Sequence, residues 1–279
     1  MRRVLVILAL ASLALSAQAR RRAVSAPAGD GFALASLRPV VGSASIVALG
    51  DATHGTHEFY ALRLPMIEYL VREMGFDVLS IEGPFALFER INVYAQGGPG
   101  DPRALLAEAS QRLRYFFWNV EEMLAVIEWV RAYNLAHERK IAIAGADIYD
   151  YEGAAAAVMA RHPDADYSCV VRGERDGECE ATARAVRDAL LARGADADTI
   201  HYADIVLQAF HLQLYEPREE SMAANLLWIR EHRGSKVIHW GHQEHVGKLP
   251  SPYARGRTMG TILSERLGSD YVAIGTLAG

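Results

Sequence analysis

The 279-residue sequence has few cysteines, no long apolar segment after its N-terminal region and no excess of positive charge. Its two cysteines are too few to form a metal centre of their own. No segment after residue 19 is long and apolar enough for a transmembrane helix. The formal net charge of −5 makes nucleic acid a poor candidate as a partner. What is present, 51% hydrophobic and 23% charged residues, is typical of a globular protein with a core.

Several standard catalytic motifs are missing as well. There is no Gly-x-Ser-x-Gly, Ser-x-x-Lys or His-Glu-x-x-His, and no cysteine follows a predicted strand as a nucleophile. The segment "GHQEHVGKL" does not match a phosphate-binding loop, because five residues separate Gly241 from Gly247 and Leu249 stands where Ser or Thr is needed. The remaining chemistry is that of histidine and carboxylate, which suits an activated water or a bound metal.

The first 19 residues have the pattern of a secretory signal peptide. A basic start precedes an apolar stretch over residues 4–15 and a small-x-small end at 17–19. An uncleaved membrane anchor is the alternative, although the apolar stretch is short for a span. Cleavage would remove two arginines and change the formal charge from −5 to −7. The pattern predicts a periplasmic or secreted protein without a membrane span after cleavage.

The two cysteines, Cys169 and Cys179, flank the polar segment "CVVRGERDGEC". In an exported protein we expect them to form a disulfide that closes this short loop. A pair of free thiols is the alternative that the sequence leaves open.

Short apolar runs alternate with helical patterns after an exposed linker at residues 20–30. The runs predict strands at 46–49, 78–81, 141–144, 237–240 and 271–274. The helical patterns lie at 57–74, 84–95, 102–113, 119–136, 178–193, 203–231 and 258–267. Together they predict a single α/β domain over residues 31–279, with a mostly parallel sheet, helices on both faces and an added helical layer from residues 85–136.

Ionisable side chains follow four of the five predicted strands. In chain order they are Asp51, His54, His57, Glu82, Asp147, His242 and His245. In open α/β sheets, ligands bind beyond the carboxyl ends of the strands, so these residues predict one site at that edge.

Two kinds of chemistry fit these residues. A general base needs a neutral imidazole near a water and a carboxylate to orient it, and His54 is best placed, with Asp51 or Glu82 as its partner. Alternatively, His-x-x-His pairs at 54/57, 239/242 and 242/245 would serve as zinc ligands. Arg63 would either hold a substrate oxygen or neutralise a carboxylate. Tyr215 and Arg218, on either side of Pro217, would face the cleft or mark a helix bend.

Five segments resemble successive blocks of the erythromycin esterase family. They are "LGDATHGTHEFYALR", "MGFDVLSIEG", "WNVEEMLAVIEWVRAYN", "REESMAANLLWI" and "KVIHWGHQEHVGK". Members typically carry Gly-Glu-x-x-His after the first strand, an arginine nine residues beyond that histidine, a glutamate after the second strand and a His-Asn-x-His block after the fourth. The matching positions here are Asp51, His54, Arg63, Glu82, His242 and His245.

The resemblance implies a hydrolase, similar to antibiotic-inactivating esterases, that needs neither a serine nucleophile nor a metal or other cofactor. His54 would activate water for attack on the carbonyl of a small-molecule ester or lactone, such as a macrolide. The other implied catalytic residues are Glu82, Asp51, His245 and His242, and the implied substrate contacts are Arg63, His57, Tyr215 and Arg218. The alternatives are a metal- or haem-iron-binding protein on a related fold and a non-catalytic ligand-binding homologue.

The sequence departs from the family pattern at three places. Asp51 stands where glutamate is usual, which shortens the reach of the carboxylate, and Gln243 stands where asparagine is usual. The sequence ends with "YVAIGTLAG", whereas typical members continue with further strands and helices. The third departure predicts a shortened substrate cleft.

Overall fold

The computed structural model describes residues 33–113, 115–212, 215–249 and 256–276; the predicted signal peptide and linker lie outside them. The chain separates into two compact units, Met1–Gly42 and Ser43–Gly279. The described part of the first consists of the short helices η1 (Leu34–Ser36) and α1 (Leu37–Val41). The second contains the sheet and every candidate site residue.

The second unit is built on five parallel strands in the order β3-β2-β4-β1-β5. They are β1 (Ile46–Asp51), β2 (Val78–Pro84), β3 (Ala142–Asp147), β4 (Val237–His242) and β5 (Tyr271–Thr276). The predicted parallel sheet is confirmed. Each strand extends beyond the apolar run that predicted it. Polar residues that we expected in the turns after the strands are therefore the last residues of the strands. Asp51 thereby lies in register with His242 on one side and Thr276 on the other.

The remaining elements are helical. The α-helices of the second unit are α2 (His57–Ala61), α3 (Arg63–Met74), α4 (Phe85–Ala95), α5 (Pro102–Arg112), α6 (Glu121–Ala136), α7 (Tyr151–Arg161), α8 (Ser168–Val171), α9 (Gly177–Ala192), α10 (Ala197–Gln208), α11 (Tyr215–His232), α12 (Gln243–Val246) and α13 (Met259–Leu267). Short 3-10 helices are η2 (Phe116–Trp118), η3 (Ala209–His211) and η4 (Gly268–Asp270). Four α-helices begin at an aspartate whose side chain accepts from the backbone N–H groups of the first turn: Asp101, Asp150, Asp176 and Asp196.

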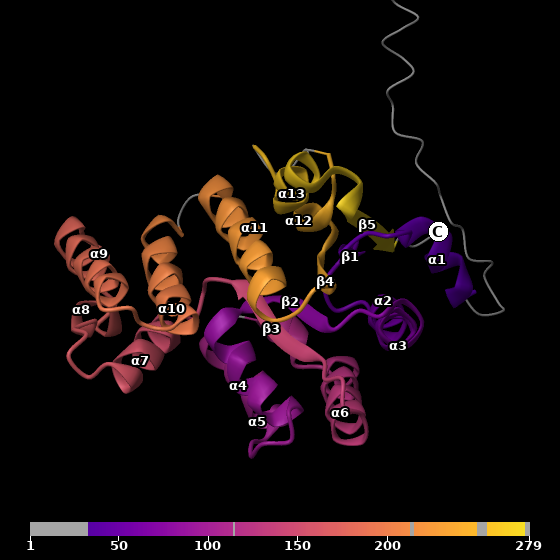
Figure 1. Ribbon diagram of the computed structural model, residues 1–279, viewed down its shortest axis with the longest axis horizontal. Coiled ribbons are helices and arrows are strands. Elements are labelled where there is room, and N and C mark those ends of the chain that lie inside the picture. The colour runs from indigo at the N-terminus through magenta and orange to yellow at the C-terminus, as the bar shows by residue number, and fades with distance from the viewer. Residues whose placement is uncertain (1–32, 114, 213–214, 250–255, 277–279) are drawn as a thin grey trace, which may run out of the picture. The chain divides into compact units, whose positions relative to one another are not determined.

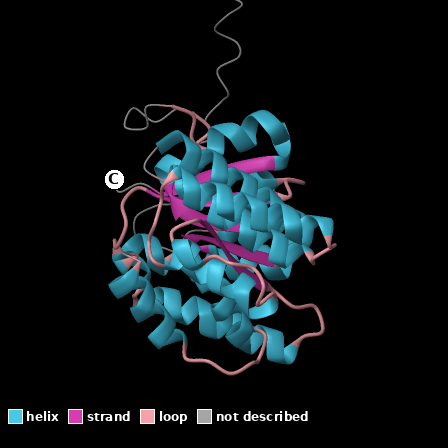
Figure 2. Cartoon of the chain, turned by 90° about the vertical axis from the view of Figure 1, so that its left-hand side faces the viewer, coloured by secondary structure: helices cyan, strands magenta, loops and turns pink. Residues whose placement is uncertain are grey.

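Helices cover both faces of the sheet. Figure 1 shows α11 and α13 on one side of the strands and α2 to α6 on the other. Helix α4 contacts β3, and α6 contacts α4 and α3, so residues 85–136 belong to one of these two layers. The additional helical layer is instead formed by α7 to α10, which contact one another and stand in front of the strands in Figure 2. The sequence therefore predicted such a layer but assigned it to the wrong segment.

Two predicted helices are each broken in the structure. The expected helix over 57–74 divides into α2 and α3, and the expected helix over 203–231 divides into α10, η3 and α11. In both cases a proline, Pro65 or Pro217, is the third residue of the helix that follows the break. Proline is tolerated in the first turn of a helix but not in its interior, so each proline sets a helix start. Among the described residues, no helix is long and apolar enough to span a membrane.

Candidate active site

A buried group of charged side chains lies at the carboxyl edge of the sheet. It consists of Glu82 from β2, Asp147 from β3, Arg218 and Glu219 from α11, and His245 from α12. We call these five residues the charged cluster. Asp147 and Glu219 are fully buried and Glu82 is 2% exposed, so their negative charges must be balanced by neighbours inside the protein.

Arg218 contacts both carboxylates that the strands contribute. Its Nη2 donates to Oδ2 of Asp147 at 2.5 Å and lies 3.4 Å from Oε1 of Glu82. Tyr115 donates its hydroxyl to the same oxygen of Asp147 at 2.5 Å. Burial disfavours the charge of Arg218, but the charge of Asp147, its hydrogen bond to Arg218 and the charge of Glu82 act together against burial and hold the pKa of Arg218 above its ordinary value. Arg218 is thus a permanent cation of the charged cluster.

His245 lies between two carboxylates. Its Nδ1 is 2.5 Å from Oε1 of Glu219, and its Nε2 is 3.3 Å from Oε1 of Glu82. Burial disfavours the imidazolium, but the negative charge of Glu82 and the hydrogen bonds to Glu219 and Glu82 raise the pKa of His245 to about 10. At neutral pH His245 is therefore a second cation, without a lone pair to accept a proton from water.

Glu219 was not predicted from the sequence. It accepts from the backbone N–H of Met259 at 2.7 Å as well as contacting His245, so it joins α11 to α12 and α13. The sequence shows two adjacent glutamates, Glu219 and Glu220, on one helix. Only the packing distinguishes them, because Glu219 is buried and Glu220 is exposed.

Glu82 is held in its ionised form at the centre of the charged cluster. Its Oε2 accepts from the backbone N–H of His242 at 2.6 Å, at a place where the register between β2 and β3 is irregular. Burial alone would raise the pKa of Glu82, but the charges of His245 and Arg218 lower it below its ordinary value. Gly241 permits this approach, since a Cβ there would lie 3.0 Å from Oε2 of Glu82. Glu82 is therefore a fixed anion and a weak base.

One of the sequence interpretations proposed that Asp51 orients His54. In the structure, the carboxylate of Asp51 is instead bonded to other side chains. Its Oδ1 accepts from Nε of Arg63 at 3.0 Å and also from Nη2, and its Oδ2 accepts from the indole Nε1 of Trp240 at 2.6 Å. Arg63 further donates to the carbonyl of Gly50 at 3.1 Å. Asp51 and Arg63 are both completely buried. Of the two roles considered for Arg63, the structure shows neutralisation of a carboxylate.

His54 follows β1 and is held by aromatic contacts. Its ring stacks on Phe117 with the centroids 4.0 Å apart, and it lies 4.7 Å from the ring of His242. No hydrogen bond to its ring is found among the described residues, and its Nδ1 is buried. Burial, opposed by the charge of Glu82 and reinforced by that of His245, lowers the pKa of His54. His54 is thus a neutral imidazole beside the charged cluster; Phe117 had not been predicted as its support.

His242 is committed to backbone groups. Its Nε2 lies 3.2 Å from the carbonyl oxygen of Ala52, which can only accept, so this nitrogen carries a proton. Its Nδ1 accepts from the backbone N–H of Glu244 at 3.4 Å. Both ring nitrogens of His242 are therefore occupied, and the nearby histidine whose ring is not so committed is His54.

Comparison with known proteins identifies the family. A sequence profile described as erythromycin esterase matches residues 71–279. The chain belongs to the erythromycin esterase family. It is 32% identical over 112 residues to the erythromycin esterase type II of Escherichia coli, an alignment that covers 40% of this chain and 25% of that protein. The chain thus corresponds to only part of that relative.

Solved structures agree with this assignment. The chain is similar to a Bacillus cereus protein with a TM-score of 0.70 and 26% identity, covering 88% of this chain and 69% of the other. It has the fold of the erythromycin esterase EreC, determined as a histidine-to-asparagine mutant in its open conformation, with a TM-score of 0.62 and 20% identity over 86% of this chain and 72% of that one. The matched profile includes Glu82, Arg218 and His245 but begins after His54.

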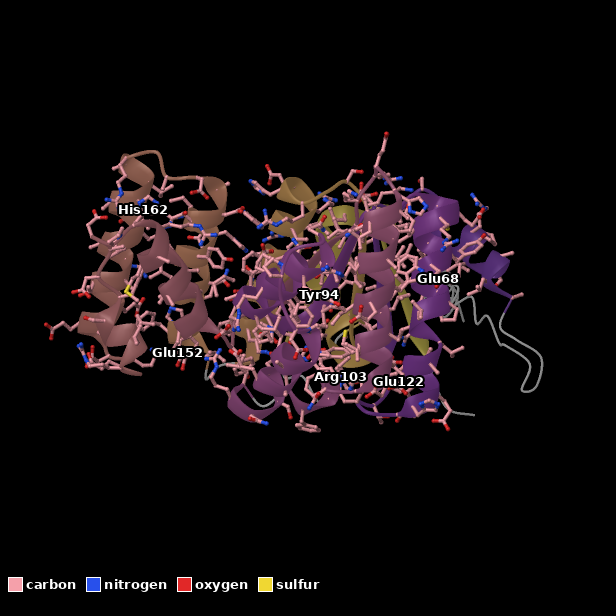
Figure 3. The ribbon with its side chains drawn as sticks, turned by 90° about the horizontal axis from the view of Figure 1, so that it is seen from below. Glu68, Tyr94, Arg103, Glu122, Glu152 and His162 are labelled. Atoms are coloured by element: carbon pink, nitrogen blue, oxygen red, sulfur yellow. A yellow bond between two sulfur atoms is a disulfide. The ribbon has the colours of Figure 1, made fainter. Side chains whose placement is uncertain are left out.

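His57, which the erythromycin esterase resemblance proposed as a substrate contact, lies outside the charged cluster. The side chain of His57 is 74% exposed and pairs through Nδ1 with Glu122 of α6, whose position is labelled in Figure 3. Tyr215 is the first residue of α11, and its side chain lies outside the described part of the structure. The role of each in binding substrate stays a prediction.

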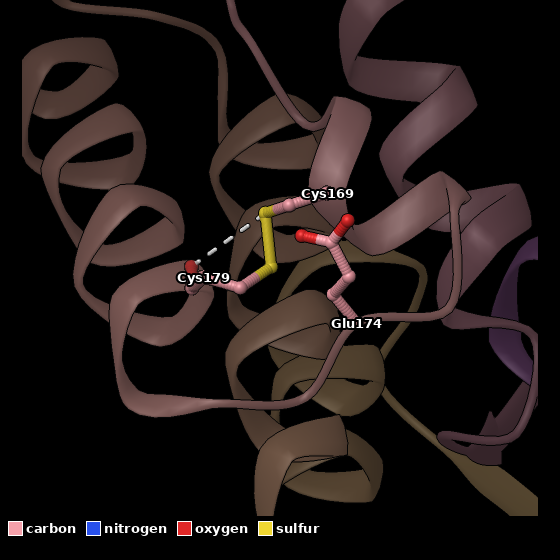
Figure 4. A group of neighbouring side chains, drawn as sticks. All are labelled: Cys169, Glu174 and Cys179. Carbon is pink, nitrogen blue, oxygen red and sulfur yellow. Dashed lines mark hydrogen bonds between the residues drawn. A yellow bond between two sulfur atoms is a disulfide. The ribbon is translucent and has the colours of Figure 1, made fainter.

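The structure also tests how the cysteines and histidine motifs are arranged. Cys169 and Cys179 form the predicted disulfide, with a Cα–Cα distance of 5.8 Å. In the described ranges, the group of three side chains close enough to hold one metal ion is Cys169, Glu174 and Cys179, shown in Figure 4. Its two sulfurs are bonded to each other and offer no thiolate. His239, which the zinc interpretation used, is fully buried, with its Nδ1 3.0 Å from Oγ of Ser80.

Proposed function

We propose that this member of the erythromycin esterase family hydrolyses an ester or lactone with a water molecule that His54 activates. The observation that carries the proposal is the contrast between His54 and its neighbours. His245 is held as a cation and His242 is bonded through both nitrogens, whereas His54 is neutral and its ring has no hydrogen-bond partner in the described chain. A general base requires such an uncommitted imidazole.

The proposed reaction begins with a proton transfer from water to His54. The water oxygen bonds to the carbonyl carbon of the substrate as this proton leaves. The bond between that carbon and the leaving oxygen then breaks, and the proton passes from His54 to the leaving alkoxide. The products are a carboxylate, after loss of its own proton to solvent, and an alcohol; a lactone gives a single hydroxy acid.

In the proposed mechanism, the two cations of the charged cluster, and not its carboxylates, stabilise the negative charge that develops on the carbonyl oxygen. Arg218 and the protonated His245 place two positive charges beside Glu82, with side chains 15% and 9% exposed. In a site with little water, fixed cations stabilise an oxyanion more strongly than they would in solution. Glu82 and Glu219 keep these cations in place and keep His245 protonated. This assignment gives Glu82 an electrostatic role and leaves the proton transfer to His54.

The proposal is tested by assaying the purified protein against a panel of esters and lactones that includes a macrolide, with and without a strong chelator. We expect turnover of at least one ester that is unchanged by chelation, because the mechanism needs no metal. Loss of turnover on chelation, restored by one added metal, would instead support a metallohydrolase. Absence of turnover on the whole panel would support the non-catalytic alternative.

The pH dependence of kcat/KM gives a sharper test. The base must be neutral to act, so activity should rise with pH through an apparent pKa below 6.5, the ordinary value for histidine. It should then stay level until His245 loses its proton at a pH of about 10. A pH–rate profile measured with one ester from pH 4 to about 11 tests both limbs. An acidic limb clearly above 6.5 would contradict a base whose pKa is lowered by burial.

We also propose that the protein is exported and cleaved near Arg20, which the basic and apolar N-terminal pattern supports. The disulfide Cys169–Cys179 is of the kind that persists in an oxidising compartment. Intact-mass measurement of protein recovered from the exported fraction should therefore give a chain that starts near Arg20. A full-length mass recovered from membranes would contradict cleavage.

A further inference from the structure

A cavity of about 650 Å³ lies next to the charged cluster, on the side of the additional helical layer. Its polar lining consists of Arg112, Tyr149, Tyr151, Glu152 and Arg175, and its apolar lining includes Phe210. A volume of this size is within the range of small-molecule sites. Nothing in the proposed reaction at His54 uses these residues.

The cavity and the charged cluster are connected by the chain between β3 and α7. Strand β3 ends with Asp147, which binds Arg218; Tyr149 follows in the loop, and Tyr151 and Glu152 begin α7, and all three line the cavity. The ring of Tyr149 lies 5.2 Å from the guanidinium carbon of Arg218. Tyr149 therefore separates the two sites by a single side chain, and a ligand in the cavity would lie beside the charged cluster.

The two arginines of the cavity differ in how their charges are balanced. Arg112 donates to Asp150 at 2.6 Å and to Glu108 at 3.1 Å, so two carboxylates neutralise it. Arg175 donates to the backbone carbonyl of Glu174; its side chain is 25% exposed, but its Nη2 is buried and has no hydrogen-bond partner within the described residues. The nearest carboxylate, Glu152, lies 3.9 Å from that Nη2, which is beyond hydrogen-bond distance.

Arg175 is also held in position without a bound anion. Its guanidinium lies 3.7 Å from the centre of the Tyr151 ring and 5.7 Å from that of Phe210. It belongs to the loop that the Cys169–Cys179 disulfide closes, so the disulfide restricts the segment that carries it. A guanidinium fixed against aromatic rings with an unused donor is suited to a planar carboxylate, and the rings and Leu113 suit an apolar group attached to it.

We propose that this cavity binds an organic carboxylate with an apolar or aromatic body, and that Arg175 is the residue that recognises the carboxylate. This inference rests on the proposed function and names its substrate class. The substrates are esters whose acid or alcohol part carries a free carboxylate in addition to the ester group. Glu152 opposes such a ligand by its charge and competes with it for Arg175. The two residues therefore have opposite effects on binding.

Direct binding tests the proposal without reference to catalysis. The probes are 3-phenylpropanoate and its neutral amide, titrated calorimetrically into the oxidised protein. We expect the acid to bind about tenfold or more tightly than the amide. Arg175→Gln should abolish this preference, whereas Glu152→Gln should strengthen acid binding severalfold. Arg172→Gln is the matched control, because Arg172 lies in the same loop and pairs with Glu174 on the surface.

Equal binding of acid and amide by the unaltered protein, or a preference that survives Arg175→Gln, would overturn the proposal. Should Arg175→Gln fail to fold, the sign of the Glu152→Gln effect still decides, since weaker acid binding in that variant contradicts the model of competing charges. Acid binding without hydrolysis of any ester would overturn the proposed function and leave this inference standing. If neutral and carboxylate-bearing esters are hydrolysed with equal KM and the two probes bind equally, this inference is overturned and the proposed function stands.

Discussion

His54→Ala should lower kcat/KM for an ester substrate by about 10²-fold or more, because it removes the proposed general base. The same change should alter the free energy of unfolding by less than about 2 kcal/mol, since the ring is only partly buried and makes no hydrogen bond within the described structure. Steady-state kinetics and urea unfolding of the same preparation measure the two effects.

A matched control is His137→Ala. His137 is exposed, directly follows α6 and bonds through Nδ1 to the carbonyl of Tyr133 in that helix, and it has no place in the charged cluster. It should leave kcat/KM unchanged. Full activity of His54→Ala would show that the base has been assigned to the wrong residue. A large loss of stability in that variant would show instead that the stacking of His54 on Phe117 is structural.

The fold was predictable because its signals are local. Apolar runs of about one strand's length alternate with amphipathic stretches, and this alternation alone indicates a parallel sheet covered by helices. The errors in helix boundaries were also local. Pro65 and Pro217 each stand three residues into a helix, and the rule that confines proline to the first turn would have placed both breaks correctly.

The location of the site was predictable, but the pairing within it was not. Position at a strand end follows from the sequence, and it brought Glu82 and Asp147 to one edge of the sheet. Which cation neutralises which anion depends on contacts between distant segments. Arg218 is 71 residues from Asp147, and His245 is 26 residues from Glu219. No local pattern distinguishes Glu219 from Glu220 or marks Phe117 as the support of His54.

The protonation state of His245 illustrates the same limit. A histidine after a strand suggests proton transfer, yet its protonation state is set by the two carboxylates that flank it in space. The sequence supplied all three residues but not their distances. His54 and His245 both follow strands in the sequence, yet the pKa of one is lowered and that of the other is raised, because His54 is buried against a phenylalanine and His245 is enclosed by carboxylates.

The largest expected effect on stability concerns Asp51 and Arg63. Both side chains are completely buried and are bonded to each other, so Asp51→Asn or Arg63→Met alone leaves one buried charge without its partner. Each single change should lower the free energy of unfolding by about 3–5 kcal/mol. The double variant should cost clearly less than the sum of the two, because it removes both charges together.

The double-mutant cycle is measured by urea unfolding of the wild type, both single variants and the double variant. The disulfide is kept oxidised so that the same unfolding transition is compared in all four proteins. Glu121→Gln is the control for loss of an ion pair as such, because its pair with Arg103 is on the surface and should contribute nothing measurable. Strictly additive costs for Asp51 and Arg63 would mean that the two residues act independently. Asp51 would then again be a candidate to orient His54, and Asp51→Asn should lower kcat/KM as well as stability. Coupled costs instead assign Asp51 to the support of β1, the strand that His54 follows in the chain.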